Sequence, residues 1–338
     1  MAVINLGPDK PSSALLIPSS KTASQYLRDL KGKVVLVTGA NTGIGYHTVK
    51  FLARKGAKVY LGARDEAKAA AAIAELETEG LGPGYGEVVW LKVDFSDPKL
   101  AKSAAEEFMT LESRLDILIN NATQLTGPFE ITKYGISKLM IVNHFSPFVF
   151  TRTLLPLLTK TSLEDEDSDV RIVTLTSMAH GKSRATNPDI QFRDLKDFND
   201  EFPNNTWPDW SRYCATKLCS ILFARELQRQ LSSSPSTSRI LSIPIHPGSV
   251  NTFASRTPIP LLASLVMGIF FLTPEEGAYT SCFAAASPKL REEPDKWAGV
   301  YLEPVGKRGK ISQNAKRDEL ARELWETTEM ILKDVVGI

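Results

Sequence analysis

The sequence predicts an α/β fold in which helices cover both faces of one parallel sheet of about seven strands, a doubly wound arrangement in a single domain. Three observations predict it. Short runs of β-branched and apolar residues recur along the chain, segments with helical periodicity separate them, and glycines cluster directly after the first run. Strands that are apolar throughout are typical of parallel sheets buried on both faces, and right-handed crossovers place helices on each side.

The predicted elements follow one another at regular intervals. The strands are the runs rich in valine, isoleucine and leucine at 33–39, 58–64, 87–94, 115–122, 171–177, 239–248 and 299–306. Helices are expected between them, at 43–55, 65–79, 97–113, 132–158 and around 213–227. We therefore expect a domain over 31–310 with loops at 178–210 and 251–273 beside the substrate, an irregular Pro- and Ser-rich extension over 1–30, and a C-terminal helix over 311–338.

Charge and cysteine content exclude several classes of protein. Forty basic and thirty-nine acidic side chains give a net charge of +1, which provides no electrostatic basis for binding nucleic acid. The three cysteines, Cys214, Cys219 and Cys282, lack metal-ligand spacing and are expected to be buried free thiols. Because the first twenty residues do not resemble a secretory leader, we expect a reducing, cytoplasmic location. The four histidines also lack metal spacing, so no metal site is predicted and they are interpreted as packing residues: His47, His144, His180 and His246.

One apolar stretch raises the question of a membrane. Residues 259–272 form a run of fourteen residues, whereas a spanning helix needs about 20, so no transmembrane helix is predicted. The interpretation is a lid over a pocket or a core helix, with shallow membrane contact as the alternative.

The glycine cluster lies at the end of the first strand, in TGANTGIG, and comprises Gly39, Gly43 and Gly45. Glycines there let the backbone turn tightly and approach a pyrophosphate, while the following helix offers free amides and the positive end of its dipole. The strand before and the helix after are the context that a dinucleotide-binding loop requires. We expect the residues between the glycines to contact the cofactor as well: Asn41, Thr42 and Ile44.

The end of the second strand bears on which nicotinamide cofactor is bound. An acid there would take the ribose 2′-hydroxyl of NAD, and an arginine the 2′-phosphate of NADP. Arg64 ends this strand, which carries no acid, and Asp65 is expected to cap the helix that follows. The sequence therefore favours NADPH. The alternative, NADH, would follow if Asp65 turned onto the ribose.

Three polar residues, Ser177, Tyr213 and Lys217, are candidates for a catalytic site. Ser177 ends the strand 171–177, at the carboxyl edge of the sheet, where doubly wound folds bind ligands. Tyr213 and Lys217 are four residues apart in a helical run, so they share one face of a helix.

Together these motifs resemble the short-chain dehydrogenase/reductase family, over residues 33 to about 306. The G-x-x-x-G-x-G spacing is its fingerprint, and its catalytic set of Asn, Ser, Tyr and Lys is matched in order by Asn143, Ser177, Tyr213 and Lys217. GANTGIG, the pattern YxxxKLxxxLFxREL at 213–227 and TPEEGA at 273–278 are similar to the retinol-dehydrogenase and WW-domain-oxidoreductase type and to fungal members of specialised metabolism.

The resemblance implies a Rossmann-type fold and a role for each matched residue. Tyr213 would give a proton to the substrate oxygen, and Lys217 would lower the pKa of that phenol and bind the nicotinamide ribose. Ser177 would hydrogen-bond the substrate carbonyl, and Asn143 would hold a water in a proton relay. Thr123 stands where the family's Asn-Asn-Ala-Gly motif has glycine. Further cofactor contacts are implied for Asp94, Phe95, Asn120, Asn121, Ala122, Pro247, Gly248, Val250 and Thr252.

The segment between Ser177 and Tyr213 is thirty-five residues long and rich in aromatic residues. Phe202 and Trp207 are predicted to bind a bulky apolar ketone or aldehyde, with plain surface packing as the alternative. The expected function is that of an NADPH-dependent carbonyl reductase; the alternatives are the same enzyme working as an alcohol dehydrogenase and a cofactor-sensing regulator. Relatives pair through the helices predicted at 132–158 and 213–227, so a homodimer or tetramer is considered, which the added chain ends could block.

Overall fold

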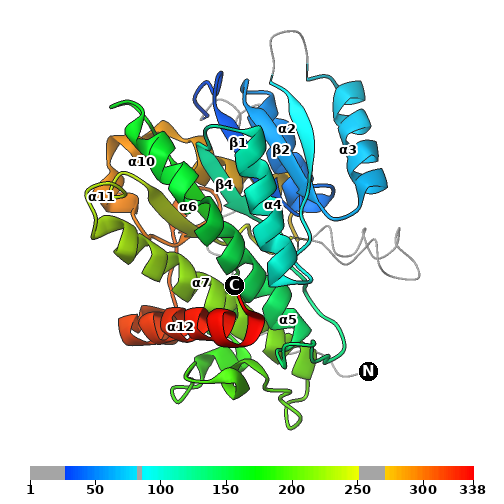
Figure 1. Ribbon diagram of the computed structural model, residues 1–338, viewed down its shortest axis with the longest axis vertical. Coiled ribbons are helices and arrows are strands. Elements are labelled where there is room, and N and C mark those ends of the chain that lie inside the picture. The colour runs from blue at the N-terminus through cyan, green and yellow to red at the C-terminus, as the bar shows by residue number, and fades with distance from the viewer. Residues whose placement is uncertain (1–26, 82–85, 251–270) are drawn as a thin grey trace.

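The computed structural model (Figure 1) describes residues 27–81, 86–250 and 271–338 and contains one eight-stranded sheet in the order β3-β2-β1-β4-β5-β6-β7-β8. Every neighbouring pair is parallel except β7 and β8. The strands are β1 (Val34–Thr38), β2 (Lys58–Ala63), β3 (Val88–Lys92), β4 (Ile117–Asn120), β5 (Arg171–Leu175), β6 (Leu241–Ile245), β7 (Leu302–Glu303) and β8 (Lys307–Arg308). The doubly wound sheet is thus confirmed. The eighth strand arises because a turn at Gly306, with φ of 67°, folds the residues that follow the last predicted strand back against it.

Helices cover both faces of the sheet, as predicted. One face carries α4 (Pro98–Leu111), α6 (Ser146–Leu163), α7 (Pro208–Ser232) and α12 (Asp318–Ile331), and the other carries α2 (Gly43–Ala53), α3 (Glu66–Glu79) and α9 (Pro274–Ala286). The short helices are α5 (Lys138–Met140), α10 (Pro288–Glu292) and α11 (Pro294–Trp297). In β1, Val34 and Leu36 pack into one layer while Val35 and Val37 pack into the other. This two-sided burial explains why the strands are apolar throughout.

The helix predicted at 132–158 begins later and is interrupted, so this boundary is wrong. Ser137 caps α5, a π-helical turn follows at Ile141–Phe145, and α6 then runs to Leu163. Pro147, in the first turn of α6, has no N–H to donate to the carbonyl of Asn143 four residues earlier. The backbone instead widens by one residue, as the bond from Ser146 N to Ile141 O shows.

The C-terminal helix is also shorter than predicted: α12 spans Asp318–Ile331 and ends in a π-helical turn at Leu332–Val336. It packs across α6 and α7 (Figure 1). The Trp325 ring stacks on Phe223, with centroids 5.7 Å apart, and meets Phe148 edge-on at 4.7 Å. Part of the surface of the two helices through which pairing of two chains was considered is thus occupied by α12.

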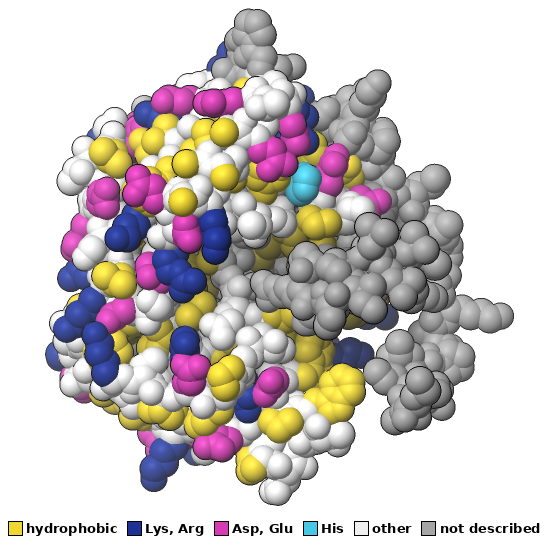
Figure 2. All heavy atoms as spheres, turned by 90° about the vertical axis from the view of Figure 1, so that its right-hand side faces the viewer, with side chains coloured by type: hydrophobic (Ala, Val, Ile, Leu, Met, Phe, Trp, Pro, Cys, Tyr) yellow, Lys and Arg dark blue, Asp and Glu magenta, His cyan; other side chains and the backbone are white. Residues whose placement is uncertain are grey.

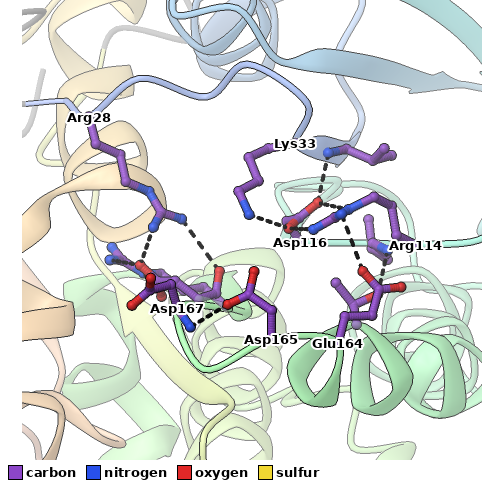
Figure 3. Close-up of polar contacts among 12 residues, drawn as sticks. Arg28, Lys33, Arg114, Asp116, Glu164, Asp165 and Asp167 are labelled. Atoms are coloured by element: carbon purple, nitrogen blue, oxygen red, sulfur yellow. Dashed lines mark hydrogen bonds and ion pairs between the residues drawn. The ribbon is translucent and has the colours of Figure 1, made fainter.

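Buried ion pairs hold the amino ends of the central strands together (Figure 3). The Asp116 carboxylate, fully buried before β4, accepts hydrogen bonds from the Val34 amide at 2.9 Å and from the Arg114 guanidinium at 2.7 and 2.9 Å. Lys33 lies 3.4 Å from the same carboxylate. These contacts fix the start of β1 against β4.

A second buried pair lies before β5. Asp169 binds the Arg171 guanidinium through both carboxylate oxygens, at 2.8 and 2.6 Å, and also pairs with Arg28 at 2.8 Å. Arg171 further donates to the carbonyls of Ala284 and Ser287 at the C-terminus of α9. A cation there satisfies free carbonyls and the negative end of the helix dipole. The last residues of the predicted N-terminal extension are thus packed against the domain.

On the face seen in Figure 2, basic and acidic side chains are interspersed rather than gathered by sign. Within the described ranges, no helix has the length and apolar character needed to cross a bilayer. Residues 251–270 lie outside the described residues, and with them most of the predicted lid at 259–272 and the loop predicted at 251–273.

Candidate active site

Three of the four predicted catalytic side chains meet at the carboxyl end of β5. Ser177 follows this strand, and Tyr213 and Lys217 lie one turn apart on α7. The Lys217 ammonium nitrogen is 5.6 Å from the centre of the Tyr213 ring, and the Ser177 side chain lies near enough to the Tyr213 phenol to act on its pKa. The Ser177 hydroxyl oxygen also accepts the Ala179 amide at 3.2 Å, which leaves its hydrogen for another acceptor.

Burial governs the electrostatics of Tyr213 and Lys217. It raises the pKa of Tyr213, and the nearby Ser177 side chain acts in the opposite direction. Burial lowers the pKa of Lys217, which is only 3% exposed, to about 7, and its Nζ donates to the Leu175 carbonyl at 3.1 Å. In the protein without cofactor, burial thus outweighs any lowering of the Tyr213 pKa, and the expected lowering by Lys217 together with the charge of the oxidised nicotinamide stays a prediction. Enclosure disfavours the phenolate and the ammonium alike, so a partly neutral lysine offers little charge.

Asn143 lies in the π-helical turn and uses its whole amide group. Its oxygen accepts from Thr123 Oγ1 at 3.2 Å and from the Gln124 amide at 2.8 Å. Its nitrogen donates to the Gln124 carbonyl at 2.8 Å and to Thr216 Oγ1 at 3.1 Å. Thr123, which replaces the family's glycine, thus supports Asn143. Because Thr216 precedes Lys217 on α7, Asn143 joins the end of β4 to the helix that carries the candidate acid.

The next residue, His144, anchors this turn to the C-terminal helix. Its Nε2 lies 2.8 Å from Thr328 Oγ1, whose hydrogen goes to the Leu324 carbonyl at 2.6 Å. Complete burial lowers the pKa of His144 to about 3, so the ring is neutral and donates from Nε2.

The glycine loop has the close backbone approaches that a dinucleotide site needs. A Cβ on Gly39 would lie 2.8 Å from Ala122 Cα, and one on Gly45 would lie 2.5 Å from the Gly39 carbonyl oxygen. Gly43, with φ of 60°, opens α2, and a Cβ there would meet no atom within 4 Å from other segments of the described chain. Thr42 makes no side-chain cap, so the first-turn amides of α2 are not capped by that side chain. These features fit a pyrophosphate at the helix N-terminus.

Asn121 holds the loop in shape. Its side-chain nitrogen donates to the carbonyls of Thr38 and Gly39, at 2.8 and 2.9 Å. Thr38 Oγ1 in turn accepts the amides of Asn121 and Ala122. Asn120 points the other way, to Thr151 Oγ1 at 2.8 Å. The bonds from the Asn121 side chain to the Thr38 and Gly39 carbonyls therefore support the backbone of the glycine loop.

At the end of β2, Arg64 is exposed and makes no hydrogen bond or ion pair with the residues that the structure describes. Asp65 caps α3: its Oδ1 accepts the Lys68 amide at 3.0 Å, and this bond holds the pKa of the carboxyl below its usual value. The predicted capping role of Asp65 is therefore confirmed. In the loop that follows β3, the Asp94 carboxylate accepts a hydrogen bond from the Ser96 amide at 2.8 Å, and Phe95 is buried.

The remaining predicted contacts follow β6. Gly248 has φ of 96°, and Val250 forms a parallel bridge with Leu272. A Cβ on Gly277 of α9 would lie 2.6 Å from Val250, so α9 approaches this loop closely. Pro247 is half-buried, and Thr252 lies outside the described residues.

The two aromatic residues predicted to bind substrate, Phe202 and Trp207, differ in their surroundings. Phe202, 9% exposed, lines a cavity of about 300 Å³ behind α7 with Phe192, Phe198 and Met140; Ser177, Tyr213 and Lys217 do not line it. Trp207 is 59% exposed at the start of α7.

Trp210 belongs to the aromatic segment singled out in the sequence, but it was not among the residues predicted to bind substrate. Its ring packs on Tyr213, with centroids 5.5 Å apart and planes at 30°, and it stays 37% exposed. The three-residue spacing to Tyr213 was the available signal.

The fold, the loop and this cluster are those of oxidoreductases that use a nicotinamide nucleotide. The chain belongs to the short-chain dehydrogenase/reductase family, whose short chain dehydrogenase profile matches residues 33–188. A short-chain dehydrogenase/reductase of Armillaria gallica is 44% identical over 315 residues, covering 91% of this chain and 95% of that one. Human retinol dehydrogenase 14 is 35% identical, covering 90% and 87%. A crystal structure of an uncharacterised protein from Mycobacterium paratuberculosis aligns with a TM-score of 0.66 at 27% identity, covering 92% and 97%.

Proposed function

We propose that this oxidoreductase uses NADPH to reduce a ketone or aldehyde with a bulky apolar body to an alcohol. The observation that carries the proposal is the proximity of Ser177 to Tyr213, with Lys217 enclosed beside them. A buried phenol whose pKa is raised keeps its proton until an acceptor of rising basicity arrives, which is what a general acid requires. Both hydroxyls can therefore meet one carbonyl oxygen.

When bound, the cofactor supplies a hydride to the carbonyl carbon. The oxygen gains negative charge as the carbon accepts the hydride, and the Ser177 hydroxyl stabilises that charge by donating a hydrogen bond. Tyr213 transfers its proton to the same oxygen, which completes the alcohol. With a pKa of about 7, Lys217 can exchange a proton near neutral pH and return one to the site. Asn143 holds Thr216, and through it the α7 turn, in register for this exchange.

The preference for NADPH rests on Arg64 and Asp65. The Arg64 guanidinium is exposed at the end of β2, beside the position that a ribose 2′-phosphate takes in this fold. Asp65 is turned into α3 by its bond to the Lys68 amide, so its charge does not oppose a phosphate. The loop at Gly39 to Gly45 would hold the pyrophosphate, and the turn at Gly248 would lie on the nicotinamide side.

The preference for a bulky apolar substrate rests on Trp210. Its ring lies on Tyr213 and remains partly exposed, so a substrate that reaches the phenol passes along an indole face. Large aromatic surfaces favour large apolar ligands. Met178, directly after Ser177, is also exposed and adds a flexible apolar side chain.

We also propose a cytoplasmic location, because Cys214, Cys219 and Cys282 are all buried free thiols. Because α12 packs against part of both α6 and α7, we propose further that two chains do not pair through those helices.

The test is oxidation of NADPH followed by absorbance with a panel of carbonyl compounds, including 2-acetonaphthone and the small aldehyde propanal. We expect turnover with the bulky ketone and slower turnover with propanal. Reversal with the matching alcohol and NADP would show the dehydrogenase direction. Tight NADPH binding without turnover of any compound would refute the reductase and favour a cofactor sensor.

A further inference from the structure

His180 makes two hydrogen bonds that its place in the sequence did not predict. It lies in a 3₁₀ turn at Met178–Gly181, three residues after Ser177, and its side chain is almost completely enclosed. Its Nδ1 is 2.6 Å from the Ser177 carbonyl oxygen. Its Nε2 is 3.2 Å from the amide nitrogen of Ser312. The Tyr301 ring meets the imidazole edge-on at 5.0 Å. The interpretation of His180 as a plain packing residue is therefore incomplete.

The partners determine which nitrogen carries the proton. A backbone carbonyl can only accept, so Nδ1 of His180 must donate to Ser177. A backbone amide can only donate, so Nε2 must accept from Ser312. His180 is consequently neutral and protonated on Nδ1. Burial, which lowers its pKa, acts in the same direction.

These bonds bear on the geometry of Ser177. Its carbonyl also accepts the His180 amide at 3.1 Å, so the imidazole adds a second donor to the same oxygen. Because two donors hold the Ser177 carbonyl, they fix the orientation of its extended backbone, which has φ of −161° and ψ of 158°. The hydroxyl, which accepts from the Ala179 amide, is then aimed from a fixed base. His180 thus acts on the site through Ser177 without reaching a substrate.

On its other side, His180 is bonded to the segment that follows β8, the last strand of the sheet. Ser312 begins a short segment whose next turn, Asn314–Lys316, also binds the loop after Ser177. Asn314 donates from Nδ2 to the carbonyls of Ala185 and Asn187, both at 2.8 Å. The loop is thereby held at three points by residues 312–314, which lie more than a hundred positions later in the sequence.

We propose that His180 is a positioning residue for Ser177, held as the Nδ1–H tautomer by the Ser312 amide and clamping the Ser177 loop to the C-terminal segment. The inference rests on the proposed function for its consequence in catalysis. The contact itself can be measured without substrate or cofactor.

The first measurement is the tautomer in the wild-type protein. Histidine labelled with ¹⁵N is observed by NMR at neutral pH, and the His180 signals are assigned by their absence in His180→Asn. We expect the Nδ1–H pattern. An Nε2–H or doubly protonated ring would overturn the inference, whatever the enzyme does.

The second measurement compares His180→Leu with His180→Asn, whose side-chain amide can still donate to the Ser177 carbonyl. With 2-acetonaphthone and NADPH, we expect His180→Leu to lower kcat about tenfold or more, which is about 1.4 kcal/mol of transition-state stabilisation. KM for NADPH should change less than about twofold, and His180→Asn should recover most of kcat. Equal losses in both variants would show a purely structural role, and unchanged kcat in His180→Leu would show none. Absence of turnover in the wild type would instead refute the proposed function.

Discussion

Replacing Lys217 by methionine should stabilise the protein without cofactor at acid pH. The ammonium is enclosed on α7, where burial lowers its pKa from 10.5 to about 7. The unfolded chain therefore binds a proton more readily than the fold does, and folding is penalised wherever the unfolded lysine is charged. The penalty is full below pH 7, shrinks between pH 7 and 10.5, and vanishes above that range. Methionine has a similar shape and no charge.

The magnitude follows from the shift. A change of one pKa unit is worth about 1.4 kcal/mol, so the shift from 10.5 to about 7 corresponds to roughly 5 kcal/mol as an upper limit. Losing the hydrogen bond to the Leu175 carbonyl returns about 1 kcal/mol of that. We expect Lys217→Met to gain about 2–4 kcal/mol at pH 6 and almost nothing at pH 10.

The assay is urea unfolding of the cofactor-free protein at several pH values. Lys160→Met is the matched control, because Lys160 donates to the Ser113 carbonyl at 3.1 Å from an exposed position. Its effect should be small and independent of pH. A Lys217→Met protein less stable than wild type at pH 6, or a gain that does not change with pH, would show that Lys217 is not held at a low pKa.

Three further predictions address cofactor, substrate and stability. Arg64→Ala should raise KM for NADPH about ten- to a hundredfold and that for NADH little, since a charge-assisted contact is worth roughly 1.5–3 kcal/mol; a wild type that prefers NADH would contradict this. Trp210→Ala should slow 2-acetonaphthone far more than propanal in NADPH oxidation assays, whereas Trp207→Ala should affect both little, and equal losses for both compounds would contradict a substrate wall. In Asp169, burial raises the pKa but the hydrogen bonds from Arg171 outweigh it and lower the pKa, so its stabilisation is present at neutral pH and is lost as pH falls through the lowered value. Asp169→Asn should therefore cost about 3–5 kcal/mol at pH 7 in urea unfolding, and the cost should shrink as the pH falls below 3.8, the ordinary pKa of aspartate; a cost independent of pH would contradict this account.

Patterns of residues close together in the sequence were enough to predict the strands of the sheet and the main residues of the candidate site. The strands could be predicted because burial on both faces makes each of them apolar throughout, as in β1. Tyr213 and Lys217 could be placed together because helical spacing alone brings them to one face. The capping role of Asp65 followed from its position before a helical run.

The missed features depend on contacts between distant parts of the chain. His180 looked like a packing residue because its partner Ser312 lies 132 positions away. The docking of Trp325 on α6 and α7 could not be read from an amphipathic helix alone. The interruption at Asn143 did have a local cause, the missing N–H of Pro147, which the predicted continuous helix overlooked.

The central claim, that Tyr213 gives the proton in an NADPH-dependent reduction, is tested most directly by Tyr213→Phe. NADPH fluorescence titration and NADPH oxidation with 2-acetonaphthone are measured on both proteins. We predict unchanged NADPH binding and a loss of turnover of about 10²–10⁴-fold, the usual contribution of a general acid. A variant that keeps more than about a tenth of the wild-type rate would contradict the claim.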